Sequence, residues 1–165
     1  MKSLILLLTI SVTFSFSFSQ NKEICIENLS IFAESAKVKN YDEAYKPWSD
    51  VKDECPDLNL AIYTYGERIL KSKIKNAQPE DIDSYKNQLI ELYDQWLIYF
   101  PLKRGTSVVG DILSSKAQSM IDYQVGSPSE VYELFDKAFT NDSKSFTNPK
   151  RLYNYFKTLY NIYKE

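Results

Sequence analysis

The sequence contains no histidine and only four glycines among its 165 residues. Without histidine a Ser-His-Asp triad cannot form, and zinc sites lose one of their main ligand types. The chain also has no glycine-rich phosphate loop and no nucleophile elbow. Glu67 and Asp111 could supply a catalytic carboxylate pair, but acidic residues on helices usually form a solvated face. We therefore expect no enzymatic activity, no metal and no cofactor.

A strong net charge is absent as well. The chain has 20 Lys and Arg against 22 Asp and Glu, which gives a net charge of −2. Its lysines are scattered along the sequence rather than clustered. Nucleic acids and anionic membrane surfaces attract clustered positive charge, so neither is expected as a partner.

The low glycine content and the lack of alternating apolar runs argue against β-sheet. Apolar periodicity and helix caps instead predict an all-α domain of about seven helices. Asn40 with Glu43 forms a predicted capping box for the second helix, and Ser127 with Glu130 forms one for the sixth. The predicted helices lie near 23–39, 40–56, 57–71, 79–101, 106–123, from 127 onward, and 148–165.

The N-terminal segment has the pattern of a secretory signal peptide. Lys2 gives a positive start, residues 4–18 are apolar and uncharged, and Ser17 and Ser19 supply the small residues of a cleavage site. A membrane anchor is the alternative, but the apolar stretch is shorter than the roughly 20 residues that a span needs. We predict a signal peptide over 1–19 and one domain over 20–165, exported to the periplasm or the extracellular space, with no membrane span in the mature chain.

The two cysteines, Cys25 and Cys55, lie 15 residues before and 15 residues after Asn40. Asn40 is the predicted turn between the first two helices, and residues equidistant from the turn of an antiparallel helix pair lie side by side. An exported chain meets an oxidising compartment. We therefore predict a Cys25–Cys55 disulfide, with a redox-active or metal-binding pair as the alternative.

The predicted second helix carries a further apolar pattern. Spacings of three, four, three and five residues separate Tyr41, Ala44, Trp48, Val51 and Pro56. A Tyr65-Gly66 pair follows nine residues after the proline. This pattern resembles the second helix of a tetratricopeptide (TPR) repeat and the start of the next repeat.

The resemblance implies antiparallel helix hairpins stacked as a short TPR-like α-solenoid, with about three hairpins and a final helix. Similar apolar spacings recur in the fourth and sixth predicted helices, around Tyr93 and Phe135. The 45 residues from Pro56 to Pro101 exceed the usual repeat length of about 34. An antiparallel helical bundle is the alternative architecture.

The same resemblance implies a non-catalytic secreted scaffold that binds a protein or peptide partner in the concave groove of its repeats. The groove residues that it implies from the best-matched repeat are Leu60, Tyr63, Glu67, Leu70 and Lys71. By weaker alignment it adds Asp111, together with Lys37, Ser107, Asn154 and Lys157. A carbohydrate-binding helical-repeat protein of the cell envelope is the alternative, because the 13 tyrosines and two tryptophans could stack on sugar rings.

The last predicted helix has apolar residues around most of its circumference. They are Leu152, Tyr153, Tyr155, Phe156, Leu159, Tyr160, Ile162 and Tyr163. The terminal helix of a repeat protein normally has a polar outer face. We therefore predict that this helix docks on further repeats or on a second copy of the chain.

Overall fold

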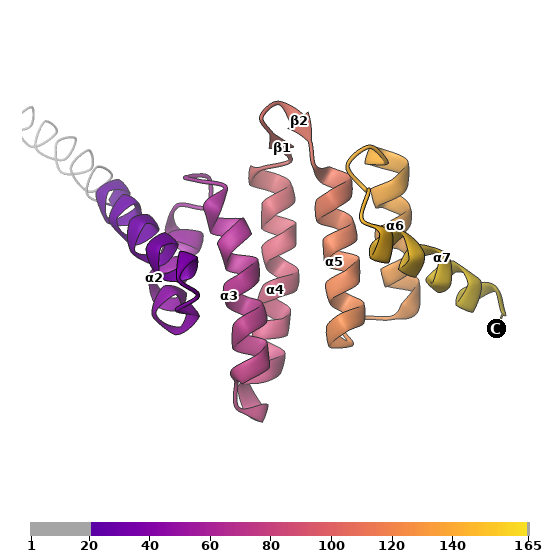
Figure 1. The fold of residues 1–165 in the computed structure, drawn as a ribbon, viewed down its shortest axis with the longest axis horizontal. Coiled ribbons are helices and arrows are strands. Elements are labelled where there is room, and N and C mark those ends of the chain that lie inside the picture. Colours follow the sequence, from indigo (N-terminus) through magenta and orange to yellow (C-terminus); the bar gives the residue numbers. More distant parts are fainter. Residues whose placement is uncertain (1–20, 165) are drawn as a thin grey trace, which may run out of the picture. The chain divides into compact units, whose positions relative to one another are not determined.

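The computed structural model describes residues 21–164, so the signal peptide predicted over 1–19 lies outside the described residues. Within that range the chain is mostly helical, with seven helices and one two-stranded hairpin (Figure 1). The first helix occupies residues 21–37 and is called the N-terminal helix here. The other elements are α2 (Tyr41–Glu54), α3 (Ala61–Asn76), α4 (Pro79–Tyr99), β1 (Leu102–Lys103), β2 (Thr106–Ser107), α5 (Val109–Tyr123), α6 (Pro128–Asp142) and α7 (Pro149–Lys164). The predicted all-α fold class is therefore confirmed for the described residues.

The described residues form two compact units, 21–69 and 70–164, whose boundary falls inside α3. In the first unit, the N-terminal helix and α2 form a hairpin whose turn includes Lys39, with a positive φ of 63°. The predicted disulfide is present, with the Cα atoms of Cys25 and Cys55 6.4 Å apart. The hairpin and the symmetric placement of its cysteines are thus confirmed.

Trp48 lies at the centre of the first unit. Its side chain is fully buried, as are those of Ala44 and Val51 one turn before and after it. Trp48 Nε1 donates to the carbonyl oxygen of Ile62 at 2.7 Å, which satisfies the one polar group that this large ring carries. The apolar spacing read from the sequence therefore marks the buried face of α2.

The capping box predicted at Asn40 does not form. Asn40 is the N-cap of α2, but its side chain makes no capping hydrogen bond. Its Nδ2 instead donates to Glu43 Oε2 at 2.6 Å. An Asn side chain carries an NH₂ donor and a carbonyl acceptor. A capping bond would use the carbonyl oxygen to accept from a backbone N–H, but Asn40 uses its NH₂ group to bond the Glu43 carboxylate.

The second unit contains a feature that the all-helical prediction missed. β1 and β2 pair antiparallel, with Lys103 opposite Thr106, and the predicted fifth helix begins at Val109 rather than at Thr106. Arg104 and Gly105, the two loop residues, both have positive φ values, of 51° and 79°. Two successive residues with positive φ form the tight two-residue turn that connects the strands of a hairpin. Here glycine occupies only the second of these two positions.

In the second unit, helices that are adjacent in sequence from α4 to α7 also pack against each other. Figure 1 shows the β1–β2 hairpin joining α4 to α5 at one end and a short link joining α5 to α6 at the other. α5 packs against α4, α6 and α7. The core that α5 and α6 share with the segment after α6 consists of Leu113, Ala117, Met120, Val131, Phe135, Ala138 and Phe146.

The backbones of α5 and α6 approach each other closely at Gly110. A Cβ atom at this position would lie 2.1 Å from the carbonyl oxygen of Asp142, so only glycine fits there. The Asp142 carboxylate accepts hydrogen bonds from Ser107 Oγ at 2.7 Å, from Ser145 Oγ at 2.5 Å and from the Gly110 backbone N–H at 3.3 Å. These donors lower the pKa of the Asp142 carboxyl, with Ser145 contributing most. The end of α6 thus supplies a negative group to the N-terminus of α5.

The predicted starts of the last two helices are confirmed. Ser127 Oγ accepts from the Glu130 backbone N–H, and the Glu130 carboxylate accepts from the Ser127 backbone N–H, which completes a capping box. The Asn148 side-chain oxygen accepts from the Arg151 backbone N–H at 3.2 Å in the first turn of α7. Local sequence therefore defines these two boundaries.

Candidate functional site

Arg151 fixes α7 on α5. Its Nη2 donates to Asp111 Oδ1 at 2.7 Å, and its Nη1 donates to the Asp111 carbonyl oxygen, also at 2.7 Å. Nη1 also lies within hydrogen-bond distance of the hydroxyl oxygens of Ser114 and Ser115. Because the Arg151 side chain is 14% exposed and its guanidinium donors are held in a rigid plane, these bonds set the position of α7 along α5.

Tyr155 fixes α7 on α6. Its hydroxyl donates to Asp136 Oδ1 at 2.6 Å. Its ring lies about 6 Å, centroid to centroid, from the rings of Tyr132, Phe135, Phe139 and Phe146. Burial, and then the nearby Asp136 carboxylate, raise the pKa of Tyr155 well above its usual value, so the phenol stays protonated and keeps donating. α7 is therefore held from two sides.

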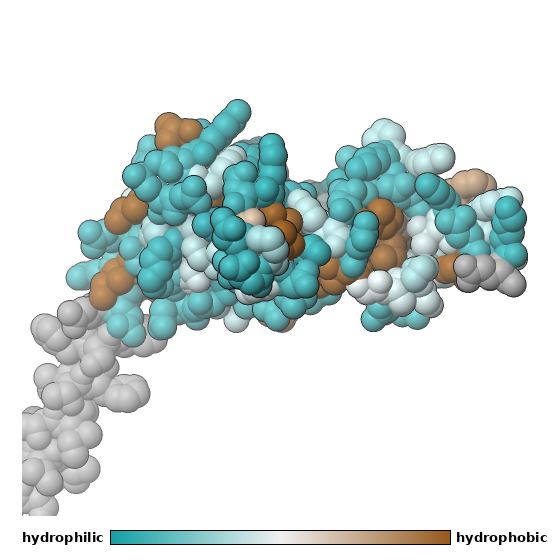
Figure 2. Space-filling view, turned by 90° about the horizontal axis from the view of Figure 1, so that it is seen from below, coloured by the Kyte–Doolittle hydropathy of each residue, from teal (hydrophilic) through white to brown (hydrophobic). Residues whose placement is uncertain are grey.

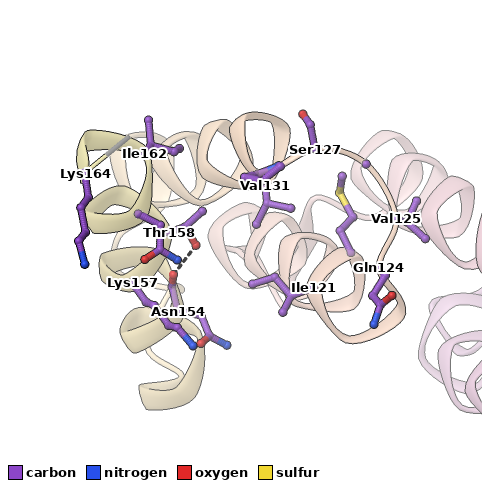
Figure 3. Close-up of a pocket in the computed structure, with 14 residues that line it drawn as sticks. Ile121, Gln124, Val125, Ser127, Val131, Asn154, Lys157, Thr158, Ile162 and Lys164 are labelled. Carbon is purple, nitrogen blue, oxygen red and sulfur yellow. Dashed lines mark hydrogen bonds between the residues drawn. The ribbon is translucent and has the colours of Figure 1, made fainter.

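A pocket of about 660 Å³ opens between α5, the α5–α6 link, the start of α6 and α7 (Figure 3). Its size is typical of sites that take a small molecule or a peptide side chain. The apolar lining consists of Met120, Ile121, Val125, Val131 and Ile162. The polar lining includes Gln124, Asn154, Lys157, Thr158, Asn161 and Lys164.

The walls of the pocket come from α5, α6, α7 and the turn that joins α5 to α6. Figure 3 shows Ile121 of α5 and Val131 of α6 in the middle of the view, with Asn154 and Thr158 of α7 on the opposite wall. On the other side the chain turns sharply from α5 to α6, with positive φ values at Gln124 (57°) and Gly126 (75°). A left-handed residue ends α5 and redirects the chain. The turn therefore forms one wall of the pocket.

The lining contains two lysines and no acidic residue. α7 itself has Lys150, Arg151, Lys157 and Lys164 over Pro149–Lys164 and no Asp or Glu in that range. Lys150 and Arg151 pair with Asp122 and Asp111, whereas Lys157 makes no ion pair with any residue that the structure describes. The pocket thus combines an apolar floor with a positively charged, amide-rich rim. Figure 2 shows hydrophobic side chains gathered over α5 and α6 on the face seen from below, with hydrophilic side chains around them.

The outer face of α7 carries a row of exposed aromatic side chains. Tyr153, Phe156, Tyr160 and Tyr163 are between 55% and 82% exposed. Their spacing of three, four and three residues places them along one side of the helix. Lys164 lies over the ring of Tyr160, with Nζ 5.8 Å from the centroid. This aromatic row borders the two lysines of the pocket rim.

The residues predicted to line a concave groove lie in both units. Leu60, Tyr63 and Glu67 belong to the first unit, and Leu70, Lys71 and Asp111 belong to the second. Tyr63 and Leu70 are fully buried, and the Tyr63 hydroxyl donates to the carbonyl oxygen of Pro56 at 2.9 Å. Their side chains are therefore core groups and are not exposed to a ligand. Leu60, Glu67 and Lys71 are partly exposed.

The Asp111 carboxylate binds Arg151, and the Asp111 side chain remains 49% exposed. Among the more weakly aligned positions, Asn154 and Lys157 line the pocket. The other lining residues were not predicted. The sequence indicated that α7 has more apolar residues than one neighbouring helix could cover. It did not indicate that the α5–α6 link lines a pocket, because Gly126 and Ser127 predicted only the end of one helix and the start of the next.

Comparison with family models, with curated proteins and with solved structures gives no match to this chain. Among the described residues, no helix is both long and apolar enough to cross a membrane. In the same part of the chain, no three His, Cys, Asp or Glu side chains come together as a metal-binding group would.

Proposed function

We propose that this protein is a non-catalytic, exported binding scaffold, built as a short TPR-like α-solenoid, that holds a protein or peptide partner. The observation that carries this proposal is the pocket between α5, α6 and α7. Its apolar floor can take a large aliphatic or aromatic side chain, and its amide side chains can hydrogen-bond a peptide backbone. Groups of this kind recognise peptides without reacting with them.

The solenoid part of the proposal rests on the order of packing. Successive helices α4, α5, α6 and α7 contact one another in the second unit. Buried residues recur with the same spacing in α2 and α6, at Ala44, Trp48 and Val51 and at Val131, Phe135 and Ala138. Stacked helix hairpins bury one continuous core in this way.

The test is selection of peptides from a displayed random library on the purified chain, followed by titration of the selected peptides by fluorescence anisotropy. Ile121→Gln, in the pocket, should weaken binding at least tenfold, because it places an amide on the apolar floor. Ile98→Gln on α4 is the matched control, since Ile98 is exposed and does not line the pocket. Peptides that bind Ile121→Gln as well as they bind the parent chain would exclude this pocket as their site.

Carbohydrate binding is a second candidate, and the aromatic row of α7 favours it. Tyr153, Tyr160 and Tyr163 are exposed on one helix, close to the amide side chains of Asn154 and Asn161. Sugar-binding sites often combine a flat aromatic ring with amide hydrogen bonds. Binding on a glycan array that is lost in Tyr160→Ala, without any selected peptide, would favour this function over peptide binding.

A further inference from the structure

The aromatic row of α7 is a large apolar surface for a monomer. Aromatic side chains bury about 150–250 Å² each, so four of them at roughly two-thirds exposure present about 400–600 Å². That area reaches the upper range of exposed patches on monomers, and such patches usually mark an interaction site. The pocket does not explain the row, because none of Tyr153, Phe156, Tyr160 and Tyr163 lines it.

A second exposed row lies on the N-terminal helix. Ile24 and Ile31 of this helix and Val38, the residue directly after its end, are separated by seven residues each and are between 46% and 76% exposed. Side chains seven residues apart lie on the same side of a helix, two turns from one another. Glu27 and Glu34, also seven residues apart, are exposed beside this row. The N-terminal helix therefore has an aliphatic row bordered by acidic groups.

The two rows are complementary in charge and in spacing. On α7 the aromatic row is bordered by Lys157 and Lys164, again seven residues apart. A seven-residue step is about 10.5 Å along either helix. Two lysines on one helix can therefore face two glutamates on the other at the same interval.

The direction of the pairing also follows from helix geometry. At 100° per residue, the lysines lie roughly 70° to one side of the aromatic row, and the glutamates lie roughly 50° to the other side of the aliphatic row. When two parallel helices face each other, one rotational side of the first helix lies opposite the other rotational side of the second. The lysines and the glutamates lie on such opposite sides of their rows, so they meet on the same flank of the contact. Antiparallel helices would place the lysines and the glutamates on opposite flanks.

We propose that α7 of one copy packs in parallel against the N-terminal helix of a second copy, with the aromatic row on the aliphatic row and Lys157 and Lys164 facing Glu27 and Glu34. The contact is heterologous, so a pair of copies keeps one free N-terminal helix and one free α7, which can bind further copies or close a ring. Pairing of α7 with another α7 is disfavoured, because both faces carry the same positive charge.

The strength of this contact should be modest. The two rows together bury on the order of 1,000 Å², at the low end for specific interfaces. Glu34 already pairs with Lys37 at 2.6 Å, but an exposed pair of this kind is worth little and can be exchanged. We expect reversible association with a Kd of about 10–100 µM, which weakens at high salt.

Sedimentation equilibrium of the processed chain over a concentration series tests the proposal with charge-reversed variants. Glu27→Lys with Glu34→Lys, and separately Lys157→Glu with Lys164→Glu, should each remain monomeric where the parent chain associates. The variant with all four changes should associate again, because the complementary charges are restored. The four substituted charged positions are all exposed, so the unfolding temperature should change little.

Three outcomes would overturn the proposal. The first is a parent chain that is monomeric up to about 1 mM. The second is a four-fold variant that stays monomeric although both double variants are folded. The third is loss of association in the Lys157 and Lys164 variant alone, which would indicate that α7 binds another surface. Peptide binding in the pocket is measured separately and is unaffected by changes at Glu27 and Glu34.

Discussion

The backbone of Gly66 lies directly against the indole of Trp48. A Cβ atom at Gly66 would be 2.5 Å from Trp48 Nε1 and less than 3 Å from two ring carbons. Trp48 is fully buried, and its Nε1 is bonded to the Ile62 carbonyl oxygen. The ring therefore cannot move aside without losing that bond, and the glycine allows α3 to approach α2 this closely.

Replacing Gly66 with alanine should destabilise the first unit. In an open helix the change would favour folding by up to about 1 kcal/mol. The clash with a fixed indole should outweigh this gain and give a net loss of roughly 1–3 kcal/mol. Urea unfolding followed by Trp fluorescence measures the difference. A double-mutant cycle with Trp48→Leu is the control, because a smaller side chain should remove most of the penalty, and additive effects would contradict the clash.

Loss of the Cys25–Cys55 bond should destabilise the chain substantially. The bond joins residues 30 apart, and closing a loop of that length is worth roughly 3–4 kcal/mol on the chain-entropy estimate. Cys25→Ser with Cys55→Ser should lower the midpoint of thermal unfolding, and reduction of the parent chain should lower it by a similar amount. An unchanged midpoint after verified reduction would count against a stabilising role.

Arg151→Ala should release α7 from α5. The change removes two charge-assisted hydrogen bonds to Asp111, each worth about 1.5–3 kcal/mol in typical cases. Hydrogen exchange read by mass spectrometry should show faster exchange over Pro149–Lys164 and no change in α2. Lys150→Ala is the control, since Lys150 is exposed and pairs with Asp122 at 3.3 Å. Equal protection of α7 in both variants would contradict the anchoring role.

Asp142 should make stability depend on acid pH. Its folded-state pKa lies below the ordinary value of 3.8, so its contribution is present at pH values above about 3.8 and is lost as pH falls through the folded pKa. Asp142→Asn should cost about 0.5–2 kcal/mol at neutral pH, as loss of a helix-capping group does.

The same variant should also show a smaller drop in unfolding temperature between pH 5 and pH 3 than the parent chain. It should retain part of that drop, because the pKa of Glu130 is lowered as well, through its hydrogen bonds to Ser127. Asp83→Asn, at an exposed position of α4, is the control. A pH profile identical to that of the parent would show that the Asp142 carboxylate gains nothing from its partners.

Local sequence signals predicted much of the fold. Ser127, Pro128 and Glu130 begin α6 as expected, because a capping box needs only residues within one helical turn. Cys25 and Cys55 could be paired because the geometry of a helix hairpin is regular. The β1–β2 hairpin was missed, since its turn depends on a positive φ at Arg104, a residue that rarely adopts one.

The candidate site was harder to predict than the fold. Tyr63 and Asp111 were both assigned to a binding groove, yet one is buried in a core and the other binds Arg151, 40 residues away in sequence. Side chains on one helix face look equivalent in sequence, and only their neighbours from other helices decide which of them remain exposed.

The sequence by itself determined the helices, most of their ends, the disulfide and the excess of apolar residues in α7, because each depends on periodicity or on groups a few residues apart. Tertiary structure decided which of those apolar residues are covered. Arg151 and Tyr155 hold one side of α7 against α5 and α6, and this leaves Tyr153, Phe156, Tyr160 and Tyr163 exposed on the other. It also created the pocket, since a cavity lined by three helices and a turn exists only once long-range packing has brought them together.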